Sequence, residues 1–139
     1  MIIQSIELNN FRNYENLQIS FDEGTNILFG DNAQGKTNIL EAAYLSGTTK
    51  SHKGSKDKEM IRFGTNEAHL RTMVLKNGKQ YQIDMHLKHN RSKGIAVNKI
   101  PMKKASELFG IFFAGRFEYY QKRSLRTQTF SGCRVMSAR

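Results

Sequence analysis

The chain has 139 residues, of which 38% are hydrophobic and 24% charged, so it has room for one domain of ordinary size and not for two complete ones. No apolar run approaches the roughly 18 residues that a membrane span needs, and the N-terminus lacks the basic and apolar regions of a secretory signal; we therefore expect a cytoplasmic protein with no membrane partner. The net charge of +10 favours nucleic acid only weakly, because half of it comes from the last 29 residues.

The first half of the chain predicts strands followed by a helix. Residues 3–8 and 17–21 alternate apolar and polar side chains and are expected to form paired edge strands. Residues 26–29 form a short apolar run of the kind that is buried on both faces of a sheet. From Gly35 the pattern changes: the spacing of Ile39, Leu40, Ala43 and Tyr44, with no Gly or Pro up to Gly47, predicts a helix.

The second half predicts a loop and an antiparallel unit. Residues 48–59 are polar and rich in Lys, which is typical of an exposed loop. Two alternating segments, 69–75 and 81–87, flank Asn77-Gly78, the usual pair of a type I′ hairpin turn. Residues 94–100 predict a third strand that stops at Pro101, and residues 103–109 a short helix.

One motif carries chemistry. The segment Gly30-Asp31-Asn32-Ala33-Gln34-Gly35-Lys36-Thr37 matches the phosphate-binding pattern G-x-x-x-x-G-K-[ST] at every fixed position, between a predicted strand and a predicted helix. Glycines let backbone N–H groups curl around phosphates at a helix N-terminus, where the helix dipole favours negative charge. Lys36 is expected to reach the β- and γ-phosphates, and Thr37 to place its hydroxyl on Mg²⁺.

A phosphate-binding loop alone does not choose among kinases, GTPases, motors and ABC-type ATPases. The nearest approach to a guanine-recognition element, Asn98-Lys99-Ile100-Pro101, lacks the acidic residue and falls in a predicted strand. A kinase or another P-loop enzyme stays open as an alternative. The single Cys133 has no neighbouring Cys/His cluster, so a zinc site at this residue is not expected.

A longer block is more specific. Residues 6–14, which include Phe11-Arg12-Asn13-Tyr14, together with the loop variant Asn32-Ala33-Gln34 and residues 38–42, closely resemble the RecF family of bacterial recombination-mediator ATPases. The likeness continues through residues 50–52, 55–59, 97–98, 101 and 107–110.

The resemblance implies an ABC/SMC-type head that binds ATP and Mg²⁺, dimerises around two nucleotides and engages single-stranded or gapped DNA. In this family the head helps to load recombinase in DNA repair, replication restart and the SOS response. It also implies that Arg12 reaches the nucleotide; the alternative is a solvated or structural arginine. The basic loop 50–58 is expected either to contact DNA phosphates or to be simply solvated.

The resemblance ends after Gly110. Relatives continue with Ser-Pro-Glu-Asp-Leu and later Arg-Arg-Arg-Phe-Leu-Asp, and synonymous codons for residues 113–133 exist that encode both segments when read one base later. We therefore expect residues 1–110 to be the N-terminal part of a RecF-like head and residues 111–139 to be an out-of-frame tail.

The predicted fold is α/β: the first lobe of a P-loop ATPase head, in which a strand and a helix join an antiparallel β-subdomain. The sequence shows no Walker B acid and no ABC signature, so no catalytic residue is assigned and no hydrolysis by this chain alone is expected. The remaining alternative is a truncated, non-functional remnant.

Overall fold

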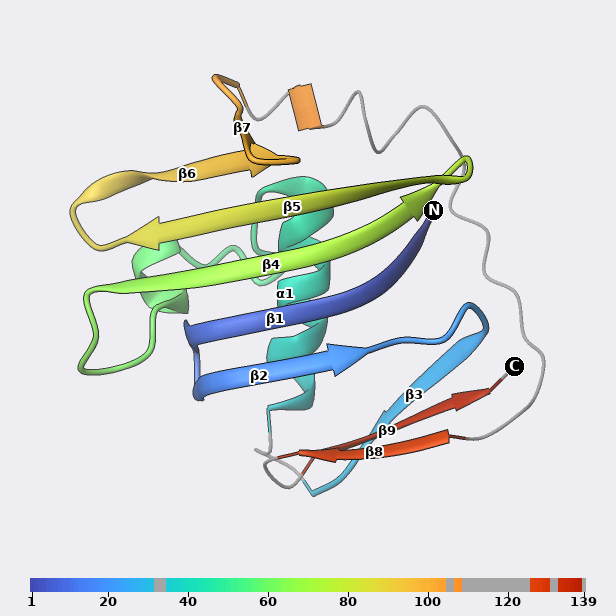
Figure 1. The fold of residues 1–139 in the computed structure, drawn as a ribbon. Coiled ribbons are helices and arrows are strands. Elements are labelled where there is room, and N and C mark those ends of the chain that lie inside the picture. Colours follow the sequence, from blue (N-terminus) through green and yellow to red (C-terminus); the bar gives the residue numbers. More distant parts are fainter. Residues whose placement is uncertain (32–34, 105–106, 109–125, 131–132, 139) are drawn as a thin grey trace.

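The computed structural model describes residues 1–31, 35–104, 107–108, 126–130 and 133–138. In these residues a six-stranded antiparallel sheet has the order β2-β1-β4-β5-β6-β7, and a smaller sheet has the order β3-β9-β8. Figure 1 shows helix α1 crossing behind the larger sheet, with the smaller sheet beside it. The elements are β1 Ile2–Phe11, β2 Tyr14–Ser20, β3 Thr25–Phe29, α1 Lys36–Thr48, the 3-10 helix η1 Asp57–Met60, β4 Glu67–Lys76, β5 Lys79–Lys88, β6 Arg91–Val97, β7 Ile100–Pro101, β8 Arg126–Phe130 and β9 Cys133–Ala138.

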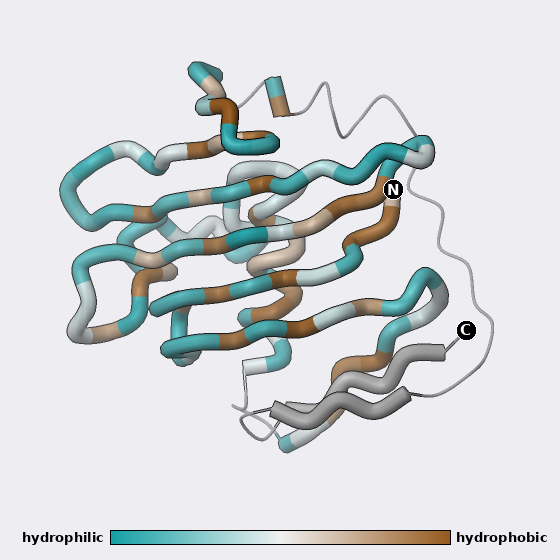
Figure 2. The backbone as a smooth tube through the Cα atoms, in the orientation of Figure 1, coloured by the Kyte–Doolittle hydropathy of each residue, from teal (hydrophilic) through white to brown (hydrophobic). Residues whose placement is uncertain are grey.

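The core lies between the larger sheet and α1. Alternate residues of β1, β4 and β5 face the helix, and Ile6, Leu70 and Ile83 are among the fully buried ones. Residues on the other face of the sheet include the ion-paired Glu7, Arg71 and Asp84, and Figure 2 shows hydrophilic and hydrophobic residues alternating along the strands. The pairing of β1 with β2 is confirmed, but β1 is not an edge strand, because β4 pairs with its other side.

Two hairpin turns of the β4–β7 region rest on positive φ angles. Asn77 and Gly78 have φ of 50° and 72°, which confirms the predicted turn between β4 and β5. The third strand ends earlier than predicted, at Val97, because Asn98 and Lys99 also adopt positive φ and reverse the chain into β7. The sequence prediction of a strand through residue 100 was wrong there, since a non-glycine pair is a weak turn signal.

Strand β3 differs from its prediction. The apolar run was expected to be buried on both faces, yet the side chain of Ile27 is 48% exposed. In the described part of the chain β3 lies at the edge of its sheet, paired only with β9. The prediction of full burial was wrong because burial depends on layers that the local sequence does not specify.

Helix α1 is confirmed, and the structure shows which of its faces is buried. Ile39, Ala42 and Leu45 face the sheet, whereas Leu40 and Tyr44 are 56% and 48% exposed. The buried face also contains a carboxylate, Glu41. Hydrophobicity alone does not specify the buried face, because the helix has apolar residues on both sides.

The predicted loop at residues 48–59 is largely exposed, but it includes most of η1 and is followed by the buried Met60 and Ile61. Of the predicted helix at residues 103–109, Glu107 and Leu108 are helical, and residues 105, 106 and 109 lie outside the described residues. Within the part of the chain that the structure describes, no helix is both long and apolar enough to span a membrane.

Candidate nucleotide-binding site

The phosphate-binding motif lies between β3 and α1, as predicted. Gly30 and Gly35 have φ of 146° and 91°, values that residues with a Cβ rarely adopt. Gly35 caps the helix, and its carbonyl accepts the N–H groups of Asn38 and Ile39 at 2.9 and 3.1 Å. Among the described residues no side chain caps the N-terminus of α1, and its first turn contains no acidic residue. The positive end of the helix dipole is therefore available to an anion.

The ammonium of Lys36 lies over the loop. Its Nζ donates hydrogen bonds to the carbonyl of Gly30 and, at 2.7 Å, to that of Asp31. A lysine at the first helical position thus places its charge beside the backbone that precedes the helix. Thr37 follows with an exposed side chain. Three predicted ligands, Asn32, Ala33 and Gln34, lie outside the described residues.

The turn between β1 and β2 braces the start of α1. Asn13 Oδ1 accepts a hydrogen bond of 2.8 Å from Asn38 Nδ2. Tyr14 packs so closely against Gly35 that a Cβ at Gly35 would lie 2.6 Å from Tyr14 Cζ and 2.9 Å from Asn13 Nδ2. The glycine is therefore required both by its φ angle and by the tyrosine ring against it.

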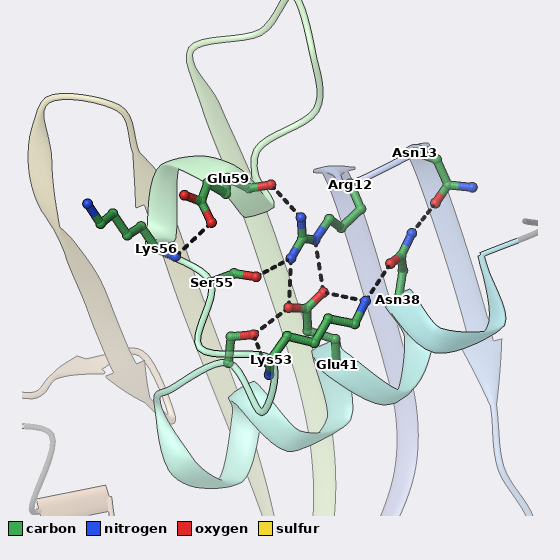
Figure 3. A network of polar contacts seen from close by, with 9 residues as sticks. Arg12, Asn13, Asn38, Glu41, Lys53, Ser55, Lys56 and Glu59 are labelled. Atoms are coloured by element: carbon green, nitrogen blue, oxygen red, sulfur yellow. Dashed lines mark hydrogen bonds and ion pairs between the residues drawn. The ribbon is translucent and has the colours of Figure 1, made fainter.

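Arg12 continues this contact one turn further along the helix. Its Nε and Nη2 each donate a 2.8 Å hydrogen bond to a different carboxylate oxygen of Glu41. Nη1 donates to the carbonyl of Glu59, and Nη2 also donates to Ser55 Oγ, both at 2.8 Å. Figure 3 shows the guanidinium enclosed by these partners. This geometry gives Arg12 a structural role; its predicted contact with nucleotide stays a prediction.

The carboxylate of Glu41 is fully buried, whereas the side chain of Arg12 is 21% exposed. Burial by itself would raise the pKa of Glu41. Hydrogen bonds from Arg12 and Ser51, with the positive charges of Arg12 and Lys53, outweigh it and hold this pKa below its ordinary value. The ion pair is therefore charged at neutral pH and joins α1 to the β1–β2 turn.

One lysine of the basic loop, Lys53, is part of the same network. Lys53 Nζ lies 3.6 Å from Glu41 Oε2 and 3.5 Å from Asn38 Oδ1. Lys50, Lys56 and Lys58 are exposed. Contact of this loop with DNA stays a prediction.

Sequence reasoning missed the role of Glu41. The signal that could have found it is the spacing of Gly35, Asn38 and Glu41, three residues apart on one helical face. These positions receive Tyr14, Asn13 and Arg12 in turn. The Arg12-Asn13-Tyr14 segment at the β1–β2 turn and the first half of α1 thus form one structural unit.

Comparisons with known proteins agree with this geometry. A family model described as an AAA domain matches residues 5–132. Proteins named DNA replication and repair protein RecF are 78% identical over 111 residues in Agathobacter rectalis and 63% in Lachnospira eligens, covering 80% of this chain. The chain spans 31% of the length of these relatives.

Solved structures show the same fold. A structure of the recombination mediator protein RecF with ATP, from the RecFOR pathway, is 34% identical, with a TM-score of 0.74 over 78% of this chain and 30% of that one. An SMC ATPase structure is 21% identical, with a TM-score of 0.70 over 81% of this chain and 78% of that one, which shows the fold alone. The predicted fold class, the first lobe of an ABC-type P-loop ATPase head, is thereby confirmed. The chain belongs to the AAA domain family and, within it, is the N-terminal part of a RecF-like protein.

Proposed function

We propose that this chain is the ATP-binding N-terminal part of a RecF-like ATPase. The observation that carries the proposal is the glycine loop from Gly30 to Gly35, which leads into an N-terminus of α1 without a side-chain cap, with the Lys36 ammonium beside it. This arrangement offers backbone N–H groups and one mobile charge to a polyphosphate. The RecF structure that is 34% identical to this chain is a complex with ATP, which supports the same ligand here.

Each residue of the site has its own role in binding nucleotide. Gly30, Asp31, Asn32, Ala33, Gln34 and Gly35 supply the backbone of the phosphate cradle. When nucleotide binds, Lys36 gives up its hydrogen bonds to the Gly30 and Asp31 carbonyls and donates instead to the β- and γ-phosphates. The hydroxyl of the exposed Thr37 ligates the Mg²⁺ that accompanies the polyphosphate. Arg12 holds the helix in place through Glu41 and is available to a nucleotide only if that ion pair opens.

At the level of the whole protein we propose ATP-dependent recombinational DNA repair in the cytoplasm. The curated relatives are named for DNA replication and repair, and an SMC structure of the same fold is described for ATP-driven dimerisation. Those names support a partner set of single-stranded or gapped DNA, a second copy of the head and the proteins that load recombinase, with roles in replication restart and the SOS response. Hydrolysis is assigned to the complete head, since this chain offers no metal-binding acid of the Walker B kind.

Lys36→Ala tests nucleotide binding. We expect the variant to bind Mg²⁺–ATP at least tenfold more weakly, since a charge-assisted hydrogen bond to phosphate contributes about 1.5–3 kcal/mol. The measurement is isothermal titration of the 139-residue chain with Mg²⁺–ATP, with and without EDTA. Lys79→Ala is the matched control, because it removes the same charge from the exposed start of β5.

Circular dichroism shows whether both variants keep the fold, which is expected because neither lysine is in the core. Equal affinity of Lys36→Ala and the parent chain would overturn the assignment of the loop. A loss of affinity in Lys79→Ala of the same size would show that only net charge matters.

A further inference from the structure

The outer face of the larger sheet, opposite α1, carries a cluster that the nucleotide site does not use. His69 on β4 and His86 on β5 are directly opposite each other, and their rings stack with centroids 3.8 Å apart. Glu67 precedes His69 by two residues and so shares its face of the strand. Its Oε2 lies 2.9 Å from His86 Nε2, and its Oε1 lies 3.9 Å from His69 Nε2.

The chemistry of this cluster is that of a metal-ligand set. One ligand atom from each of the three side chains lies within 4.8 Å of the others. A tetrahedral zinc ion with bonds of about 2.1 Å separates its ligands by roughly 3.4 Å, so small side-chain rotations bring the three atoms to bonding geometry. Two imidazoles and one carboxylate are a donor set that zinc accepts, and three protein ligands leave one position for water.

The surroundings leave room for an ion. Across the sheet the two histidines are flanked by Asn9 on β1 and Gly94 on β6, and the glycine puts no side chain beside His86. An open depression with a volume of about 780 Å³ is lined by these four residues and by the neighbouring cross-strand residues Glu7, Arg71, Asp84 and Ala96. The outer face is therefore accessible to a hydrated ion.

The charges nearby are already partnered or offset. Lys88 Nζ lies 3.8 Å from Glu67 Oε2, at the exposed edge of the cluster. Arg71 lies two residues after His69 on the same face of β4, and it is paired with Asp84 at 2.7 Å and with Glu7 at 3.6 Å. Lys88 is therefore the cation that an incoming metal ion has to displace from Glu67.

We propose that Glu67, His69 and His86 bind a divalent transition-metal ion of the zinc class on the outer face of the sheet. The ion joins β4 to β5 across the hairpin, away from the phosphate-binding loop. This site is independent of nucleotide binding, because neither its residues nor its ligand are shared with the loop.

Zinc titration of the full 139-residue chain tests the proposal, with ZnCl₂ as the probe and no nucleotide present. We expect one ion per chain, measured by competition with a fluorescent zinc indicator. His69→Ala and His86→Ala should each weaken binding at least tenfold, and Glu67→Gln should weaken it by a smaller factor. His89→Ala is the matched control, because it removes an exposed imidazole just after β5 and should leave the affinity unchanged.

A spectroscopic measurement makes the test independent of variant folding. In the parent chain, zinc should shift the imidazole NMR signals of His69 and His86 and leave those of His52 and His89 in place. The proposal is overturned if the His69→Ala/His86→Ala double variant binds zinc as tightly as the parent chain, or if the shifted signals belong to His52 or His89.

Discussion

At the scale of single residues, the Arg12–Glu41 pair decides how the β1–β2 turn is attached to α1. A fully buried carboxylate is stable only when its charge is compensated, and here a bidentate guanidinium, a serine hydroxyl and a lysine provide the compensation. The resemblance to the RecF family predicts that Arg12 is a nucleotide ligand. The sequence does not predict Glu41 as its partner, because a single glutamate in a helix is usually solvated.

Glu41→Gln tests this pair. Removing one partner of a buried ion pair costs about 3–5 kcal/mol, so we expect a comparable fall in the free energy of unfolding at pH 7, measured by urea denaturation. Glu15→Gln is the control, because Glu15 is 69% exposed and lies 3.4 Å from Arg62; a surface pair contributes only about 0–1 kcal/mol. Similar losses of unfolding free energy in the two variants would show that the buried Glu41 contributes no more stability than a surface carboxylate.

The pH dependence of the same carboxylate has a defined sign. Its pKa is lower in the folded than in the unfolded chain, so it contributes stability above the ordinary value of 4.5 and this contribution is lost as pH falls through the folded-state pKa. The parent chain should therefore lose stability below about pH 4.5 more steeply than Glu41→Gln. Parallel curves would contradict the lowered pKa.

At the scale of elements, the strand turn and the phosphate loop form one unit because Tyr14 packs on Gly35. The loop glycine was predicted from its phosphate chemistry alone. The structure adds a packing reason, since a side chain at this position meets the tyrosine ring before any ligand is considered. Substitutions in the β1–β2 turn are therefore expected to change nucleotide binding.

Gly35→Ala tests this coupling. An alanine at a φ of 91° is strained by about 1–2 kcal/mol, and its Cβ collides with Tyr14 as well, so we expect lower stability and weaker Mg²⁺–ATP binding. Gly47→Ala in the same helix is the control: nothing lies within 4 Å of its Cβ, and alanine is favoured in a helix by about 1 kcal/mol. Thermal unfolding should move in opposite directions for the two variants, and a shift in the same direction would contradict the packing explanation.

At the scale of the whole molecule, the described residues form one lobe whose apolar surface is not fully covered. Ile27 on β3 and Leu40 and Tyr44 on α1 are exposed, although the strand that contains Ile27 was predicted to be buried. The family model extends to residue 132, β9 pairs with β3 and β8 pairs with β9, whereas the RecF alignments cover 110–112 residues.

We propose that residues 111–139 are an out-of-frame tail, and the coding DNA tests it. The frame shifted by one base downstream of codon 112 should stay open well past codon 139 and encode Ser-Pro-Glu-Asp-Leu and then Arg-Arg-Arg-Phe-Leu-Asp. Stop codons in that frame, or the absence of those segments, would show that the tail is genuine coding sequence. Its six basic residues against one acidic residue would then be examined as a nucleic-acid contact.

Features that depend on neighbouring residues could be predicted from local patterns: the strand, glycine loop and helix of the phosphate site and the Asn77-Gly78 hairpin. A two-residue turn also fixes the strand register, so the opposition of His69 and His86 was already implied by the position of that turn. Only the tertiary structure decided that Glu41 is buried on Arg12, that Tyr14 packs on Gly35 and that Leu40 is exposed. These contacts join segments 20 or more residues apart or depend on which helix face meets the sheet, and neither periodicity nor spacing within one segment specifies such packing.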